Sequence, residues 1–246
     1  MSQSDVAVFV CSSDNRRDVL DSVLPSLAKF WPDCPYPVYV GLNSPAVLSP
    51  GFMPVVAPAS AWCRETGLQL QQIAAQYLIV ILDDFLIGAP VKQARVASLA
   101  GLAASQRLPY LRLVPLGRSL LERLSGGGES HAQITRIRTN HPFYAALQIA
   151  IWRKDHLLAM LAKGGTIWEF EHERIAERVH HAIVADPPII YRHVVEKGRW
   201  LPDARFVFDR AGLVFRAGNR AVWSRWRYLR LMMDRIRWLL LGYSTC

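Results

Sequence analysis

The sequence has few cysteines and no long apolar run, and both absences narrow the class of protein. Its four cysteines, in 246 residues, form no C-x-x-C pair and show no metal-ligand spacing. We therefore expect no disulfide framework, which fits a reducing cytoplasm. No run reaches the roughly 18 apolar residues of a membrane-spanning helix, and the first residues lack the basic and apolar regions of a signal peptide. These features predict a cytoplasmic protein, either soluble or peripheral to a membrane.

Acidic residues are scarce near the C-terminus. From residue 216 onward the chain has seven arginines and one aspartate, so this segment carries +6 of the formal net charge of +9. Basic proteins are candidates for nucleic-acid binding, but here the charge belongs to one terminal segment and residues 1–215 are only slightly basic. We therefore predict a main domain over 1–215, a basic tail over 216–246, and no nucleic-acid partner.

Apolar residues make up 51% of the chain, enough for the core of one large domain. The first ninety residues alternate between two kinds of pattern. Short apolar runs predict strands at 6–10, 38–42 and 77–82, and helical periodicity predicts helices at 17–30 and 63–75. This order is typical of parallel βαβ units. We predict an α/β fold with a Rossmann-type central mixed sheet flanked by helices.

The pattern of the second half is less regular. We expect helices at 91–105, 149–161 and about 172–184, and strands at 110–114 and 189–191. His180 and His181 fall in the last of these helices without a matching pair of ligands. A solvated helix surface is favoured over a metal site there.

Two adjacent carboxylates, Asp83 and Asp84, directly follow the apolar run at 77–82. The carboxyl ends of strands in open α/β sheets border the ligand crevice. Buried carboxylates need a partner, and Mg²⁺ or Mn²⁺ bound to substrate phosphates would supply one and would neutralise a leaving diphosphate. A helix N-cap beside a solvated neighbour is the alternative.

A second acidic constellation is Trp168-Glu169-Phe170-Glu171. If the segment is extended, both aromatic rings face one side and both carboxylates the other. A carboxylate among apolar rings is a candidate general base, because desolvation raises its pKa. The alternative is an acidic helix start whose aromatic residues belong to the core.

The stretch 143–155, FYAALQIAIWRKD, followed by Trp168-Glu169-Phe170-Glu171, resembles bacterial glycosyltransferases of the GT-A superfamily, which are encoded in capsule, lipopolysaccharide and other surface-glycan clusters. Their pattern has a Tyr before SLQPAIW, a basic-acidic pair, a PWEFE sequence, and an acidic doublet after an earlier apolar strand. The resemblance spans about residues 6–205. This chain departs from the pattern at Ala145-Ala146, at Ile149 in place of proline, and in having Asp-Asp rather than Asp-x-Asp.

The resemblance implies a nucleoside-diphosphate-sugar donor and a glycan or lipid-linked acceptor. The residues it implies for each part of the site are Ser12, Ser13 and Asp14 near the nucleotide, Asp83 and Asp84 at the metal and diphosphate, Trp168 at the sugar, and Glu171 or Glu169 as base. We prefer Glu171 as the base, and the cofactor implied is Mn²⁺ or Mg²⁺. A non-catalytic scaffold protein of the same fold that binds sugar nucleotides or a membrane is the alternative.

The tail at 223–238 has the periodicity of one helix. Its apolar positions include Trp226, Leu229 and Met233, and its arginines lie largely away from them. Such helices bind anionic membrane surfaces, here the cytoplasmic face of the inner membrane. Docking on the main domain or on a second subunit is the alternative.

Overall fold

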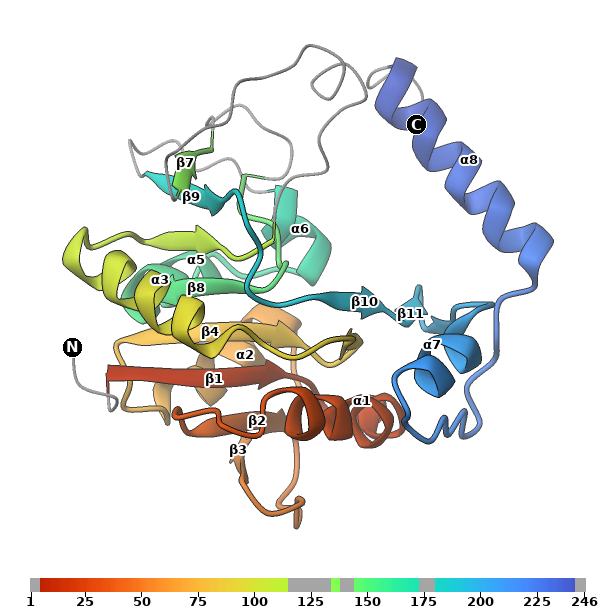
Figure 1. Cartoon of the computed structure of the whole chain (residues 1–246), viewed down its shortest axis with the longest axis horizontal. Coiled ribbons are helices and arrows are strands. Elements are labelled where there is room, and N and C mark those ends of the chain that lie inside the picture. Colours follow the sequence, from red (N-terminus) through yellow and green to blue (C-terminus); the bar gives the residue numbers. More distant parts are fainter. Residues whose placement is uncertain (1–4, 115–133, 138–143, 173–179, 242–246) are drawn as a thin grey trace.

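The computed structural model describes residues 5–114, 134–137, 144–172 and 180–241, and its main feature is a sheet of eight strands (Figure 1). Their order across the sheet is β3 (Phe52–Val56), β2 (Val38–Leu42), β1 (Val6–Cys11), β4 (Tyr77–Leu82), β8 (Ala150–Arg153), β6 (Tyr110–Arg112), β9 (His181–Val184) and β7 (Ile134–Arg136). Strands β8 and β7 run opposite to the other six. The expected α/β class with a mixed central sheet is confirmed.

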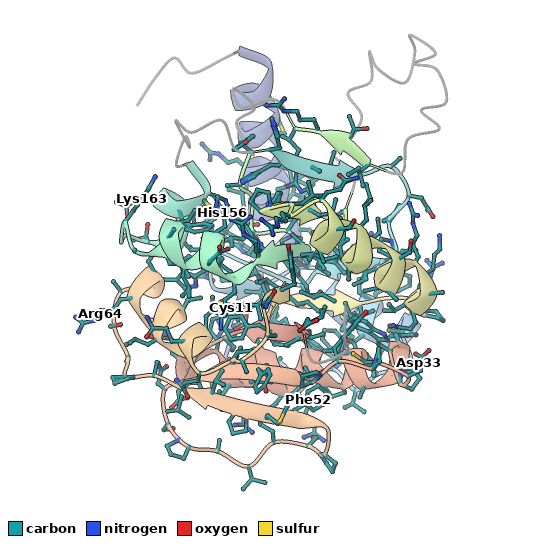
Figure 2. The ribbon with its side chains drawn as sticks, turned by 90° about the vertical axis from the view of Figure 1, so that its left-hand side faces the viewer. Cys11, Asp33, Phe52, Arg64, His156 and Lys163 are labelled. Carbon is teal, nitrogen blue, oxygen red and sulfur yellow. The ribbon has the colours of Figure 1, made fainter. Side chains whose placement is uncertain are left out.

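Helices cover both faces of this sheet. The first face packs on α1 (Arg17–Phe30) and α3 (Gln93–Ser105), and the second on α2 (Trp62–Gln71), α5 (Lys154–Leu161) and α6 (Ile167–His172). In Figure 2, Arg64 of α2 and Lys163 lie on one side of the molecule and Asp33 on the other. Strands β1 and β4 are apolar at nearly every position because both of their faces are buried.

The C-terminal part packs beside α1. It contains β10 (Tyr191–His193), which pairs with β5 (Phe85–Ile87), then β11 (Val195–Glu196), β12 (Arg199–Trp200), α7 (Ala204–Arg210) and α8 (Arg225–Leu241). An apolar cluster around Trp200 and Phe208 includes Val19 and Val23 of α1. Arg220 also donates to the carboxylate of Asp18 at 2.7 Å. Beyond these contacts, α8 extends away from the sheet (Figure 1).

Several sequence predictions fail in the second half of the sheet. The expected helix at 149–161 is wrong in its first part, because Ala150–Arg153 is strand β8 and only Lys154–Leu161 is helical. Periodicity does not separate a short apolar run in a buried strand from one in a buried helix. The expected helix at 172–184 is wrong at His181–Val184, which forms β9; residues 173–179 lie outside the described ranges. The histidine of that strand is buried rather than solvated.

In the first half the sequence analysis missed one strand, β3. It contains Pro54, and a proline within a run argues against a central strand. Proline is tolerated here because β3 is the edge of the sheet and pairs only with β2. The sequence analysis also did not predict β5, which lies outside this sheet, whereas the other strands and the helices α1 and α2 of the first ninety residues lie close to their expected ranges.

Candidate functional site

The predicted site lies between the carboxyl ends of β1 and β4. From β1 the chain passes outward to β2 and β3, and it then returns to form β4 on the other side of β1. Doubly wound sheets bind ligands at such a change of direction, because the loops after the two central strands diverge there. The structure thus brings Ser12, Ser13 and Asp14 after β1 next to Asp83 and Asp84 after β4.

Asp83 connects the two strand ends. Its buried carboxylate accepts a hydrogen bond from Ser12 Oγ at 2.7 Å and bonds from Arg16 Nε and Nη2 at 2.6–2.8 Å. This is a two-pronged guanidinium–carboxylate pair, which is the strongest geometry for a salt bridge. Both oxygens of Asp83 are therefore engaged within the protein.

The carboxylate of Asp84 differs from that of Asp83 in its pKa and in its hydrogen bonds. Burial, followed by the negative charge of Asp83, raises its pKa from 3.8 to about 7, although Arg16 at 3.6 Å from Oδ2 opposes this rise. Its Oδ1 atom is buried and has no hydrogen-bond partner in the described part of the chain. A buried acceptor of this kind is costly unless a ligand or ion satisfies it.

Whether a divalent cation fits here depends on which carboxylate oxygens are still available to bind it. Among the described residues no group of three or more His, Cys, Asp and Glu side chains lies close enough together to hold a metal. Mg²⁺ and Mn²⁺ in phosphate sites, however, often use one or two carboxylates and complete their shell from phosphates and water. Asp84 Oδ1 offers one such ligand, whereas Asp83 is occupied by Arg16. The residues fit a cation that binds through Asp84 together with a phosphate ligand.

The turn after β1 is fixed to the end of β2. Asp14 accepts hydrogen bonds from Ser44 Oγ at 2.5 Å and from the Asn43 amide at 2.8 Å, and these bonds hold its pKa below the usual range. Ser13 donates to Asn15 Oδ1 at 2.7 Å. The three residues lie at the predicted edge of the sheet, and their contact with a nucleotide stays a prediction.

The segment Trp168–Glu171 is helical, so the alternation expected for an extended segment is wrong. Thr166 and Glu169 form a capping box at the start of α6: the Thr166 amide donates to Glu169 Oε2 at 2.6 Å and the Glu169 amide donates to Thr166 Oγ1 at 3.3 Å. These bonds lower the pKa of Glu169. The sequence analysis expected a raised pKa for a carboxylate among apolar rings, and for Glu169 this expectation is wrong. Trp168 is 53% exposed, whereas Phe170 is buried with its ring 5.4 Å from that of Trp62.

Glu171 faces a different environment from Glu169. It is half-buried, and its Oε1 accepts the backbone amide of Leu147 at 2.7 Å, just before β8. Its charge contributes to the raised pKa values of both Tyr110 and Tyr191, so it lies near those phenols. Of the two candidate bases, only Glu171 is directed towards the strand ends of the sheet.

Tyr191 links the two acidic constellations, and the sequence analysis missed it. Its hydroxyl donates to Gln148 Oε1 and its ring stacks on Phe85 at 4.3 Å. Burial raises the pKa of Tyr191; Arg112 opposes this rise, and Asp84 and Glu171 add to it. Asp84, Arg112 and Glu171 therefore all lie within electrostatic reach of one phenol.

No sequence signal identified this link. Tyr191 reaches the site because β10 pairs with β5, directly after the aspartates, at a separation of about a hundred residues. Arg16 was also missed, although it lies only two residues after Asp14. Its role depends on the adjacency of β1 and β4.

Comparisons with known proteins give a likeness of fold. No family model and no curated protein sequence matches the chain. Among solved structures it is similar to S. aureus TarS 1-349 in complex with UDP-GlcNAc (TM-score 0.47, 12% identity, covering 80% of this chain and 60% of that one). It is also similar to the mannosyltransferase PcManGT from Pyrobaculum calidifontis in complex with GDP-Man and Mn²⁺ (0.49, 13%, 79% and 58%). A third is the galactosyltransferase LgtC with donor and acceptor sugar analogues (0.40, 12%, 93% and 95%).

The chain thus spans about 60% of the length of the TarS fragment. At these identities the likeness concerns the fold alone.

Proposed function

We propose that this protein is a glycosyltransferase that moves a sugar from a nucleoside-diphosphate sugar to a hydroxyl group of a glycan acceptor. The observation that carries the proposal is the buried, unsatisfied carboxylate oxygen of Asp84 at the point where the sheet changes direction. The order of the motifs, with an acidic doublet followed by Trp152 and then Glu171, supports it through the resemblance to surface-glycan glycosyltransferases.

The arrangement assigns a separate task to each residue. Ser12 and Arg16 fix Asp83 and so hold the loops after β1 and β4 together. Asp84 would hold a divalent cation, which when bound neutralises charge on the departing diphosphate. Trp168 would offer an aromatic surface to the sugar.

Glu171 would act as the general base. The acceptor oxygen forms a bond to the anomeric carbon, the bond from that carbon to the phosphate oxygen breaks, and the diphosphate leaves with the electron pair. Glu171 takes the hydroxyl proton. Its position near Tyr191 and Arg112, rather than at the exposed cap where Glu169 lies, favours it for this role.

Donor binding tests this proposal. UDP-, GDP-, dTDP- and CMP-sugars are added with and without Mn²⁺ while the melting temperature is recorded. A donor at a hundred times its Kd is expected to stabilise the fold by about 2.7 kcal/mol. Asp84→Asn should remove the part of this stabilisation that depends on Mn²⁺. Asp186→Asn, which changes an exposed aspartate paired with Lys92, should leave it unchanged. If none of these donors stabilises the wild-type protein, the proposal is wrong.

We further propose that α8 brings the enzyme to an anionic membrane surface where a lipid-linked acceptor lies. Trp226, Leu229 and Met233 are 83%, 52% and 55% exposed and follow a helical spacing. The five arginines between 225 and 237 give the helix a charge complementary to anionic lipid. Within the described ranges, no helix has the length and apolar character needed to cross a bilayer.

Vesicle flotation tests this location. Vesicles with anionic phospholipid should bind the wild-type protein, vesicles of neutral phospholipid should not, and Trp226→Ser should weaken binding. Phe206→Ser is the matched control, because Phe206 of α7 is also exposed. A dimer in solution that buries α8, or duplex DNA binding that is lost with α8, would contradict the membrane assignment.

A further inference from the structure

The guanidinium of Arg112 is buried, and two of its three nitrogens find no hydrogen-bond partner among the described residues. Arg112 is the last residue of β6, its exposed fraction is 5%, and its Nε and Nη1 atoms form no hydrogen bond within the part of the chain that the structure describes. A buried guanidinium normally pairs with a carboxylate, because desolvation of an unpaired charge is costly. Two half-buried arginines of the described ranges follow that rule: Arg16 pairs with Asp83 and Arg220 with Asp18.

The position of Arg112 places it at the candidate site. Strand β6 is parallel to β4 and separated from it by β8 alone, so Arg112 lies on the same edge of the sheet as Asp84. Tyr191 interacts electrostatically with both side chains. The positive charge of Arg112 therefore lies within electrostatic reach of the same phenol as Asp84 and Glu171.

We propose that Arg112 binds the diphosphate of the sugar nucleotide, an inference that rests on the proposed function. A guanidinium presents parallel N–H donors that match two phosphate oxygens. Binding would satisfy the two unpartnered nitrogens at once. Because the group is preorganised and shielded from water, it would stabilise the charge that develops on the leaving diphosphate without rearrangement.

Calorimetry with Arg112→Met tests the inference. The ligands are UDP, GDP, dTDP and inorganic pyrophosphate, and Arg64→Gln is the matched control, because Arg64 is exposed on α2 (Figure 2). We expect Arg112→Met to weaken binding of pyrophosphate, and of whichever nucleotide the wild type binds more tightly, at least tenfold. Arg64→Gln should bind both ligands as the wild type does. The melting temperature of unliganded Arg112→Met should equal or exceed that of the wild type, because an unpaired buried charge has been removed.

The outcomes separate this inference from the function on which it rests. If wild-type protein binds UDP, GDP or dTDP and Arg112→Met binds it equally well, the role of Arg112 is wrong and the donor site stands. If pyrophosphate binding depends on Arg112 but none of UDP, GDP and dTDP binds, Arg112 is an anion site and its assignment to a nucleotide is overturned. If Arg112→Met does not fold, Arg112→Lys replaces it: weaker pyrophosphate binding is expected from loss of the two-pronged geometry, and unchanged binding overturns the inference.

Discussion

The two halves of the sheet differ in whether the polar side chains at their carboxyl edge are paired with one another. In the half formed by β3, β2, β1 and β4, the polar side chains at the carboxyl edge bind one another, as Arg16 does with Asp83 and Ser44 with Asp14. In the half formed by β8, β6, β9 and β7, Arg112 reaches the same edge with two nitrogens that find no hydrogen-bond partner among residues 5–114, 134–137, 144–172 and 180–241.

Charged side chains that are paired within the protein serve its stability, whereas those with unsatisfied atoms are available to a ligand. Paired groups close the ends of adjacent strands, and their charge is already compensated. The guanidinium of Arg112 and Oδ1 of Asp84 are buried with unsatisfied hydrogen-bonding capacity. Each carries a free-energy cost that a bound ligand would remove. The comparison therefore predicts that substitutions in the first half mainly affect stability and those around the unpaired groups mainly affect function.

The largest expected effect is on turnover, at Glu171 of α6, whose carboxylate accepts the Leu147 amide just before β8 of the second half. Glu171→Gln should lower kcat by about 10²–10⁴-fold, the usual contribution of a general base, with little change in donor affinity. Glu169→Gln is the matched control: it alters only the capping box of α6, where Gln can also accept the Thr166 amide, so kcat should stay within about twofold of wild type and stability should change little. Transfer of radiolabelled sugar to acceptor measures both variants. Equal activity of wild type and Glu171→Gln would favour the scaffold alternative.

A smaller effect, on stability, is expected in the first half. Asp83→Ala leaves Arg16 with only Asp84, at 3.6 Å, and should lower the free energy of unfolding by about 3 kcal/mol. Asp21→Ala breaks an exposed pair with Arg17 and should cost below about 1 kcal/mol. Urea denaturation compares the two. If both variants lose the same small amount, the Arg16–Asp83 pair does not hold the strand ends together.

The third expected effect depends on pH and belongs to β9. Burial lowers the pKa of His181 from 6.5 to about 4, and its Nδ1 lies 2.9 Å from the Tyr144 carbonyl. Since a carbonyl only accepts, Nδ1 donates, and in the neutral ring Nε2 accepts from His156 Nε2 at 3.1 Å. Protonation of His181 would break the second bond.

The sign of the pH dependence follows from the lowered pKa. Between pH 6.5 and about 4 the unfolded chain binds more protons at this residue, so stability is fully present above pH 6.5 and falls by at most about 3 kcal/mol as the pH decreases to 4. Denaturation curves at several pH values should show a shallower decrease for His181→Gln than for the wild type. Parallel curves for the two proteins would rule out His181 as the cause.

Much of the first half was predictable because its elements are local. Strand β1, helix α1 and strand β4 match the apolar runs and periodicity at 6–11, 17–30 and 77–82. The doublet Asp83-Asp84 was found for the same reason, since a buried parallel strand shows its end in the sequence. The second half was predicted poorly: Ala150–Arg153 and His181–Val184 are central strands flanked by partners far away in sequence, so no local pattern distinguishes them from helix.

The sequence by itself determined the α/β class, the position of the aspartates at a strand end, and the concentration of positive charge in the C-terminal tail, because each depends on residues close together along the chain. Only the tertiary structure decided that Asp83 is neutralised by Arg16 while Asp84 and Arg112 keep unsatisfied atoms. It also decided that Glu171 acts electrostatically on Tyr191, as Asp84 and Arg112 do, whereas Glu169 caps α6. The physical reason is that the cost of a buried charge depends on which strands become neighbours, and here those neighbours come from distant parts of the sequence.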